Sequence, residues 1–179
     1  MISKGVASEI DSIITLTKEC GKNLRNNGID QWDENYPDLK SIENDIQTQT
    51  LFTYKIKNKI VGIIVLNETQ DEEYKKIDWI TPKDSKNIII HRLAVLPSYQ
   101  GRGIAKRIMD FAEEFAIKKK YDSIRLDTFS QNQRNQKFYL NRGYHELGTV
   151  YLKYKKDYPY ICYEILTQEL YINKSILIE

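Results

Sequence analysis

The stretch IIIHRLAVLPSYQGRGIAKRIMDFAEEF, which runs from Ile88 to Phe115, decides the fold of this chain. Its first nine residues, Ile88–Leu96, are nearly all apolar and predict a central strand that is buried on both faces. Gly101 and Gly103 follow within one short loop. A helix is then expected to about Lys119, because apolar residues recur there at helical spacing. The residues of this stripe are Ile104, Ile108, Phe111 and Phe115.

Length and composition set the class of the protein. A chain of 179 residues predicts a single domain, residues 1–179. Hydrophobic residues make up 41% and charged residues 29%, which is typical of a soluble globular protein. We find no apolar run of the roughly 18 residues that would span a membrane. The first residues lack the apolar core of a signal peptide, so the expected location is cytoplasmic.

Charge and the metal-binding residue types argue against several functions. The formal net charge is only +2, which is too small to indicate a nucleic-acid or membrane partner. Cys20 and Cys162 form no CxxC pair, and His91 and His145 are far apart in the sequence. We therefore expect no metal site. The sequence leaves monomer and homodimer open.

The rest of the chain alternates between helical and strand patterns. Residues 8–25 and 39–47 have helical spacing, and a further short helix is expected over residues 132–141. Strands are expected over residues 51–56, 60–66, 123–129, 144–154 and 159–167, while residues 171–179 stay unassigned. Strand, helix and strand follow one another from Ile88 to Phe129, which predicts a parallel pair with a right-handed crossover. Hairpins on either side predict antiparallel neighbours, and hence an α/β fold of mixed α+β type.

The glycine loop suggests a phosphate ligand. The start of a helix presents unpaired backbone N–H groups and partial positive charge, and glycines just before it allow close approach. The loop lacks a Walker motif, and Lys106 stands where a dinucleotide fingerprint needs glycine. It does match a third pattern, Gln or Arg, two residues, Gly, one residue, then Gly or Ala. Gln100, Gly103 and Ala105 satisfy this pattern.

A second motif lies downstream in NQRNQKFYLNRGY, residues 132–144. Together with the loop, it resembles the signatures of the GNAT superfamily of N-acetyltransferases, and the resemblance covers about Ile88 to Gly148. It rests on Asn132, Phe138, Tyr139, Gly143 and Tyr144. The resemblance implies a mixed, mostly antiparallel sheet of about seven strands flanked by about four helices. It also implies a V-shaped splay between strands 4 and 5.

The same resemblance implies an activity. An enzyme of this kind moves an acetyl group from acetyl-CoA, without a metal, to a primary amine of a small molecule or peptide by direct attack in a ternary complex. The pantetheine arm is expected along the strand backbone and the pyrophosphate at the glycine loop. Lys106 is expected to add positive charge at the phosphates, and a place on the solvated face of the helix is an equal alternative for it. The cofactor-binding residues implied are Leu93, Ala94, Val95, Gln100, Gly101, Arg102, Gly103, Ile104, Ala105, Lys106, Asn132 and Phe138.

Two residues are candidates for proton transfer. Tyr139 stands where the family carries a tyrosine as general acid, and a phenol with a pKa near 10 can donate to the leaving thiolate. His91 stands where many members carry glutamate, and an imidazole can accept a proton near neutral pH. On a regular strand it shares a face with Leu93 and Val95. A structural or substrate-orienting role for His91 is the alternative, while Glu72, Glu73 and Asp127 are poorer candidates for the base.

Aromatic residues in the variable segments are candidates for the acceptor site. Trp32, Tyr36 and Trp79 are predicted to wall an amine pocket, with core packing as the alternative. Two other functions remain open: a non-catalytic acyl-CoA-binding module, and an interaction protein whose aromatic N-terminal half binds a partner. Tyr139 argues against the first of these, whereas the absence of glutamate at position 91 leaves it open.

Overall fold

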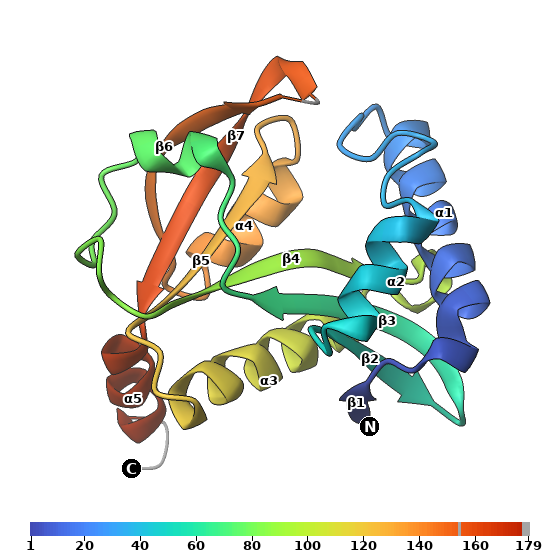
Figure 1. Cartoon of the computed structure of the whole chain (residues 1–179), viewed down its shortest axis with the longest axis horizontal. Coiled ribbons are helices and arrows are strands. Elements are labelled where there is room, and N and C mark those ends of the chain that lie inside the picture. The colour runs from blue at the N-terminus through green and yellow to red at the C-terminus, as the bar shows by residue number, and fades with distance from the viewer. Residues whose placement is uncertain (154, 177–179) are drawn as a thin grey trace. The chain divides into compact units, whose positions relative to one another are not determined.

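Seven strands and five α-helices make up the part of the chain that this computed structural model describes, residues 1–153 and 155–176 (Figure 1). The strands are β1 Ile2–Lys4, β2 Leu51–Ile56, β3 Lys59–Asn67, β4 Asn87–Val95, β5 Ser123–Phe129, β6 His145–Leu152 and β7 Lys155–Leu166. The α-helices are α1 Ile10–Asn26, α2 Leu39–Gln47, α3 Ile104–Lys118, α4 Gln133–Leu140 and α5 Thr167–Ile176. Three short 3-10 helices, η1 Ala7–Glu9, η2 Glu72–Lys76 and η3 Pro97–Tyr99, complete the order.

The strands form one mixed sheet in the order β1-β2-β3-β4-β5-β7-β6. The β4–β5 pair is parallel, with α3 in the connection between the two strands. This confirms the predicted strand–helix–strand unit. The pairs β1–β2, β2–β3, β5–β7 and β6–β7 are antiparallel, as expected for a mostly antiparallel sheet. The parallel register runs from Asn87 opposite Ser123 to Ile90 opposite Leu126.

The five α-helices agree with the expected number of about four, and α5 includes residues from position 171 on, which the sequence leaves unassigned. The start of α5 is held by polar groups: the Glu169 carboxylate accepts a hydrogen bond from the Leu166 N–H at 2.9 Å. The Thr167 hydroxyl donates to the Tyr121 carbonyl at 2.6 Å. Residue 154, at the end of the expected strand 144–154, and residues 177–179, at the end of the unassigned segment, lie outside the described part of the chain.

The chain divides into two compact units. The first holds residues 1–67 and 91–112, and the second holds residues 68–90 and the chain from 113 on. Both β4 and α3 contribute residues to each unit, and within β4 the boundary falls between Ile90 and His91. The single-domain assignment stays a prediction. Among the described residues, no helix combines the length and apolar character needed to cross a membrane.

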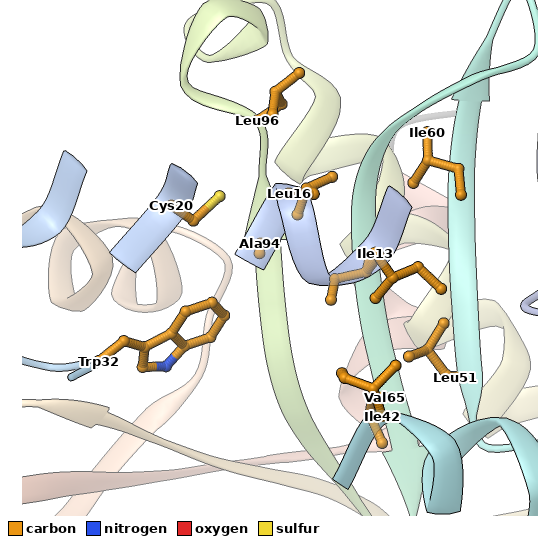
Figure 2. Close-up of a cluster of buried hydrophobic side chains, with 11 residues drawn as sticks. Ile13, Leu16, Cys20, Trp32, Ile42, Leu51, Ile60, Val65, Ala94 and Leu96 are labelled. Atoms are coloured by element: carbon orange, nitrogen blue, oxygen red, sulfur yellow. The ribbon is translucent and has the colours of Figure 1, made fainter. Parts of the chain in front are cut away.

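The first unit is built around a cluster of buried apolar side chains (Figure 2). Helices α1 and α2 lay their apolar stripes on β2, β3 and the end of β4, which removes these side chains from water. Burial of each large aliphatic side chain contributes about 1.5–3 kcal/mol. The cluster contains Ile13, Leu16, Cys20, Trp32, Ile42, Leu51, Ile60, Ile63, Val65, Ala94 and Leu96.

The second unit contains a buried polar network beside its apolar core. Arg125 on β5 donates from Nε to Glu164 Oε1 on β7 at 2.8 Å, and Glu164 also accepts from the hydroxyls of Ser123 and Thr81, each at 2.6 Å. The Arg125 guanidinium lies 4.3 Å from the ring centroid of Trp79. These contacts fix the segment before β4 onto β5 and β7, since a buried ion pair is stable only when its polar atoms are satisfied.

Candidate active site

The glycine loop joins η3 to α3 in the first unit. Gly101 and Gly103 have φ values of +74° and +73°, in the left-handed region that glycine adopts without strain. No atom lies within 4 Å of the position that a Cβ would take at either residue. The first helical bond runs from the Arg107 N–H to the Gly103 carbonyl at 3.1 Å. The N–H groups of the preceding turn therefore have no partner within the helix and face an open approach, which suits an anion.

The Gln100 side chain shapes the start of this loop. Its Nε2 donates to the Val95 carbonyl at 3.0 Å, and the Cys20 thiol lies 3.3 Å from the same oxygen. The carbonyl at the end of β4 is therefore engaged by two side chains. Sequence reasoning predicted Gln100 as a cofactor contact, and the structure shows what its amide holds within the chain.

Cationic side chains lie around the loop. The Arg102 guanidinium and the Lys59 ammonium lie 5.1 Å and 5.6 Å from the ring centroid of Tyr99. Arg107 Nη1 donates to the Tyr54 hydroxyl at 3.2 Å, and Lys106 is exposed. Ile104 is buried and Ala105 half-buried, as expected for the first turn of a helix with one face on the sheet.

Strand β4 contains an irregularity that the sequence does not reveal. Arg92 has a φ of +51°, which is uncommon for a residue with a side chain. Regular alternation along β4 is therefore interrupted between His91 and Leu93, and the expectation that His91 shares a face with Leu93 and Val95 stays a prediction. His91 and Leu93 are half-buried, whereas Ala94 and Val95 are buried.

Arg92 makes its contacts within the first unit. Its Nη1 lies 3.0 Å from Asp45 Oδ2 on α2, as an ion pair outside hydrogen-bond geometry. Its guanidinium lies 5.5 Å from the ring centroid of Tyr36. Burial raises the pKa of Asp45, and the charge of Arg92 lowers it in part.

Tyr139 is a buried residue of α4 in the second unit, only 4% exposed. Its ring packs among three others, with centroids 5.4 Å from Phe138, 6.0 Å from Tyr144 and 6.0 Å from Tyr163. Burial, and then the charge of Asp127, raise the pKa of Tyr139 above its ordinary value. The phenol therefore keeps its proton at neutral pH and is available as a donor.

The other two predicted residues of this motif support α4. Asn132 is its N-cap, with a side chain that accepts from the Asn135 N–H at 3.2 Å. Phe138 is half-buried, and the Arg142 guanidinium lies 5.8 Å from its ring centroid. Gly143 follows the helix with a φ of +87°, the left-handed conformation that is common after the end of a helix.

The three aromatic residues predicted for the acceptor site belong to different units. Trp32 is 7% exposed and lies within the cluster of the first unit, with its ring turned toward side chains from α1 and β4 (Figure 2). Tyr36 packs against it edge-on, with ring centroids 6.0 Å apart. Trp79 lies in the second unit, where Nε1 donates to the Tyr74 carbonyl at 2.9 Å. The structure thus shows packing partners for all three, and their role toward an acceptor stays a prediction.

The second unit contains a polar pair that sequence reasoning ranked low. The Tyr74 hydroxyl, from η2, donates a short hydrogen bond to Asp127 Oδ2 on β5. Burial raises the pKa of Asp127 to about 6, against the opposing effect of the Tyr74 hydrogen bond and with a further increase from the charge of Asp71. The side chain of Asp127 is nonetheless partly exposed. Tyr74 and Asp127 are 53 positions apart, so no local pattern points to the pair.

No group of three or more His, Cys, Asp or Glu side chains within the described ranges is arranged to hold a metal ion. The candidate residues therefore fall into two groups: a glycine loop at the start of α3 in the first unit, and Tyr139 with the Tyr74–Asp127 pair in the second.

Comparison with known proteins gives consistent results. A family model described as the acetyltransferase (GNAT) family matches residues 15–144. The chain is 26% identical over 145 residues to the uncharacterized N-acetyltransferase YesJ of Bacillus subtilis, covering 80% of each chain. It resembles a solved GNAT-family acetyltransferase of Streptococcus agalactiae with a TM-score of 0.80 and 23% identity, over 93% of this chain and 94% of the other. It also resembles a solved GNAT-family acetyltransferase of Listeria monocytogenes, with a TM-score of 0.74 and 20% identity over 93% of this chain and 94% of the other. The two structural likenesses show the fold.

Proposed function

Because the chain belongs to the GNAT acetyltransferase family, we propose that it moves an acetyl group from acetyl-CoA to a primary amine by direct attack in a ternary complex. The observation that carries the proposal is the glycine loop at the start of α3. Its two left-handed glycines leave open space where a side chain would stand, and the N–H groups behind them are those of a fifteen-residue helix. This arrangement fits the pyrophosphate of a coenzyme A ester.

Each part of the reaction has a candidate group in this chain. The loop backbone at Gly101–Ala105 holds the pyrophosphate, with Arg102 and Lys106 adding positive charge. Backbone groups of Leu93–Val95 pair with the pantetheine arm, and a strand N–H polarises the thioester oxygen as negative charge develops there. Tyr139 donates a proton to the departing thiolate, for which its raised pKa keeps it protonated.

The amine must be neutral before it attacks. A lysine-like amine has a pKa of about 10.4 and is mostly protonated at neutral pH, so a proton acceptor is required. The sequence predicts His91 for this step. The acceptor is a small molecule or a peptide amine, and Trp32, Tyr36 and Trp79 are the predicted contacts.

Release of free thiol from acetyl-CoA, measured with a panel of small and peptide amines, tests the proposal. We expect amine-dependent thiol release and an acetylated product of matching mass. Tight binding of acetyl-CoA without turnover of any amine would instead indicate a non-catalytic acyl-CoA-binding module. Failure to bind acetyl-CoA would exclude both functions.

A further inference from the structure

We propose that Asp127, rather than His91, accepts the proton of the acceptor ammonium, and that Tyr74 is a positioning residue that orients its carboxylate. The inference rests on the proposed function, because it concerns the proton that acetyl transfer must remove from the amine. It is carried by the placement of Asp127, by its contact with Tyr74, and by the charges around both.

Asp127 lies on β5 just beyond the residues that pair with β4. Leu126 is the last residue of the β4–β5 register, and Asp127 follows it directly. On the other side of β5, Asp127 pairs with Cys162 of β7. The flanking Leu126 and Thr128 are buried, whereas the Asp127 side chain is partly exposed. A carboxylate that is neither fully solvated nor fully enclosed can meet a substrate amine and still have a perturbed pKa.

Tyr74 fixes the orientation of this carboxylate. Its side chain is 1% exposed and its ring centroid lies 5.3 Å from that of Trp79. Trp79 is in turn held by its own hydrogen bond to the Tyr74 carbonyl and by the Arg125 guanidinium. The Tyr74 hydroxyl donates to Oδ2 of Asp127, so Oδ1 is the oxygen that this hydrogen bond does not use. A rigid hydroxyl on one oxygen thus orients the other.

The titratable groups that interact electrostatically with Asp127 come from several elements. Tyr74 on η2, Cys162 on β7 and Tyr139 on α4 all have raised pKa values, so they are neutral at pH 7. Asp71, just before η2, contributes negative charge that raises the pKa of Asp127 further. A carboxylate with a pKa of about 6 is ionised at neutral pH yet far more basic than an ordinary aspartate.

The charge of Asp127 acts on Tyr139, which relates a proton acceptor to a proton donor. Burial, and then the charge of Asp127, raise the pKa of Tyr139, so the phenol is protonated while the carboxylate is ionised. Two titratable groups held in opposite protonation states are the arrangement that acid–base catalysis requires.

The proton balance closes with these two groups. The ammonium R–NH3⁺ gives one proton to the Asp127 carboxylate and becomes R–NH2. The amine nitrogen forms a bond to the acetyl carbon, and the carbon–sulfur bond of the thioester breaks with its electron pair on sulfur. The thiolate takes the proton of Tyr139, and the second proton that the nitrogen loses converts the resulting phenolate back to the phenol. Asp127 releases its proton to solvent, so each turnover yields amide, thiol and one H⁺.

The main test is the rate of thiol release by Asp127→Asn, measured from about pH 6 to pH 10 with the best amine of the panel. We expect kcat/KM to fall about 100-fold to 10,000-fold at pH 7. The loss should shrink as the pH approaches the pKa of the amine, because solution then supplies the neutral form. His91→Gln tests the rival assignment, and we expect this variant to keep the acidic limb of the wild-type profile.

A purely structural role would give a different result, namely a loss that is the same at every pH. That result, or an Asp127→Asn profile that keeps the wild-type acidic limb, overturns the inference while the acetyltransferase proposal stands. Loss of the acidic limb from the pH profile of His91→Gln overturns the inference as well. If the wild type acetylates no amine at all, the proposed function fails and this inference fails with it.

Tyr74→Phe provides a second test that does not depend on the folding of the first variant. Removing the hydroxyl removes a hydrogen bond that favours the ionised carboxylate, so the pKa of Asp127 should rise. The acidic limb of the pH profile should therefore move to higher pH, by several tenths of a unit or more, while substantial activity remains above it. An unmoved limb in a folded Tyr74→Phe protein would contradict the role of Tyr74, and with it the proposed role of Asp127.

Discussion

The side-chain amide of Gln100 donates a hydrogen bond to the Val95 carbonyl, with 3.0 Å between Nε2 and the oxygen. This contact ties the first residue of the glycine loop back to the last residue of β4. The loop is thereby joined to the strand that the proposed function assigns to the pantetheine arm. Its geometry thus depends on a side chain as well as on the two glycines.

Replacing Gln100 with alanine should weaken acetyl-CoA binding through loop geometry. A hydrogen bond of this kind contributes about 0.5–1.5 kcal/mol, so the KM for acetyl-CoA should rise about 2-fold to 10-fold while kcat changes little. Steady-state kinetics with varied acetyl-CoA measure this. Ser98→Ala is the control, since Ser98 is an exposed neighbour in η3 and should leave KM unchanged. Equal KM values for the Gln100 variant and wild type would contradict the role of this contact.

Gly103→Ala should weaken the binding of acetyl-CoA much more than it lowers the stability of the fold. A residue with a Cβ at a φ of +73° costs about 1–2 kcal/mol of strain, and the added methyl group stands in front of the open helix N-terminus. We expect the KM for acetyl-CoA to rise at least 10-fold.

Gly28 offers a matched control for that substitution. Its φ is +74° and its Cβ position is equally open, but it lies between α1 and α2 rather than at the loop. Gly28→Ala should cost the same stability in a urea titration and leave the KM for acetyl-CoA unchanged. A similar rise in KM for both variants would show that strain alone, and not the phosphate approach, explains the result.

Tyr139→Phe should lower kcat about 100-fold or more and leave the KM for acetyl-CoA within about 2-fold, because only the proton donor is lost. Tyr163→Phe is the control: its ring also packs against Tyr139, and its hydroxyl donates to Glu146 at 3.2 Å. We expect near-normal turnover for that variant. An unchanged kcat in Tyr139→Phe would remove Tyr139 as the acid.

The parts of the site that sequence reasoning found are those determined locally. Gly101, Gly103 and Tyr139 lie in short motifs whose neighbours along the chain set their conformation, and the helix periodicity around them is strong. Tyr74 and Asp127 meet only because η2 folds onto β5, and nothing within several residues of either one signals the contact. The left-handed conformation of Arg92 could not be predicted from the sequence either. Arg92 contacts Asp45 and Tyr36, which lie far from it along the chain.

Asp127→Asn should make the protein more stable at neutral pH even as it lowers activity. The folded-state pKa of Asp127, about 6, lies above the value of about 3.9 expected for an unfolded chain. As the pH rises from about 4 to about 6, the unfolded chain ionises first, so the wild type loses stability over this window.

The wild type loses at most about 3 kcal/mol of stability in this way, and partial exposure of the Asp127 side chain reduces the loss. Asparagine does not ionise, so urea unfolding should show the variant gaining about 1–2 kcal/mol over wild type between pH 4 and pH 7.5. Such a gain is typical where function requires a poorly solvated charge. If the free energy of unfolding of Asp127→Asn instead dropped below that of the wild type as the pH rises, the ionised carboxylate would stabilise the fold. Asp127 would then not have the raised pKa that proton acceptance requires.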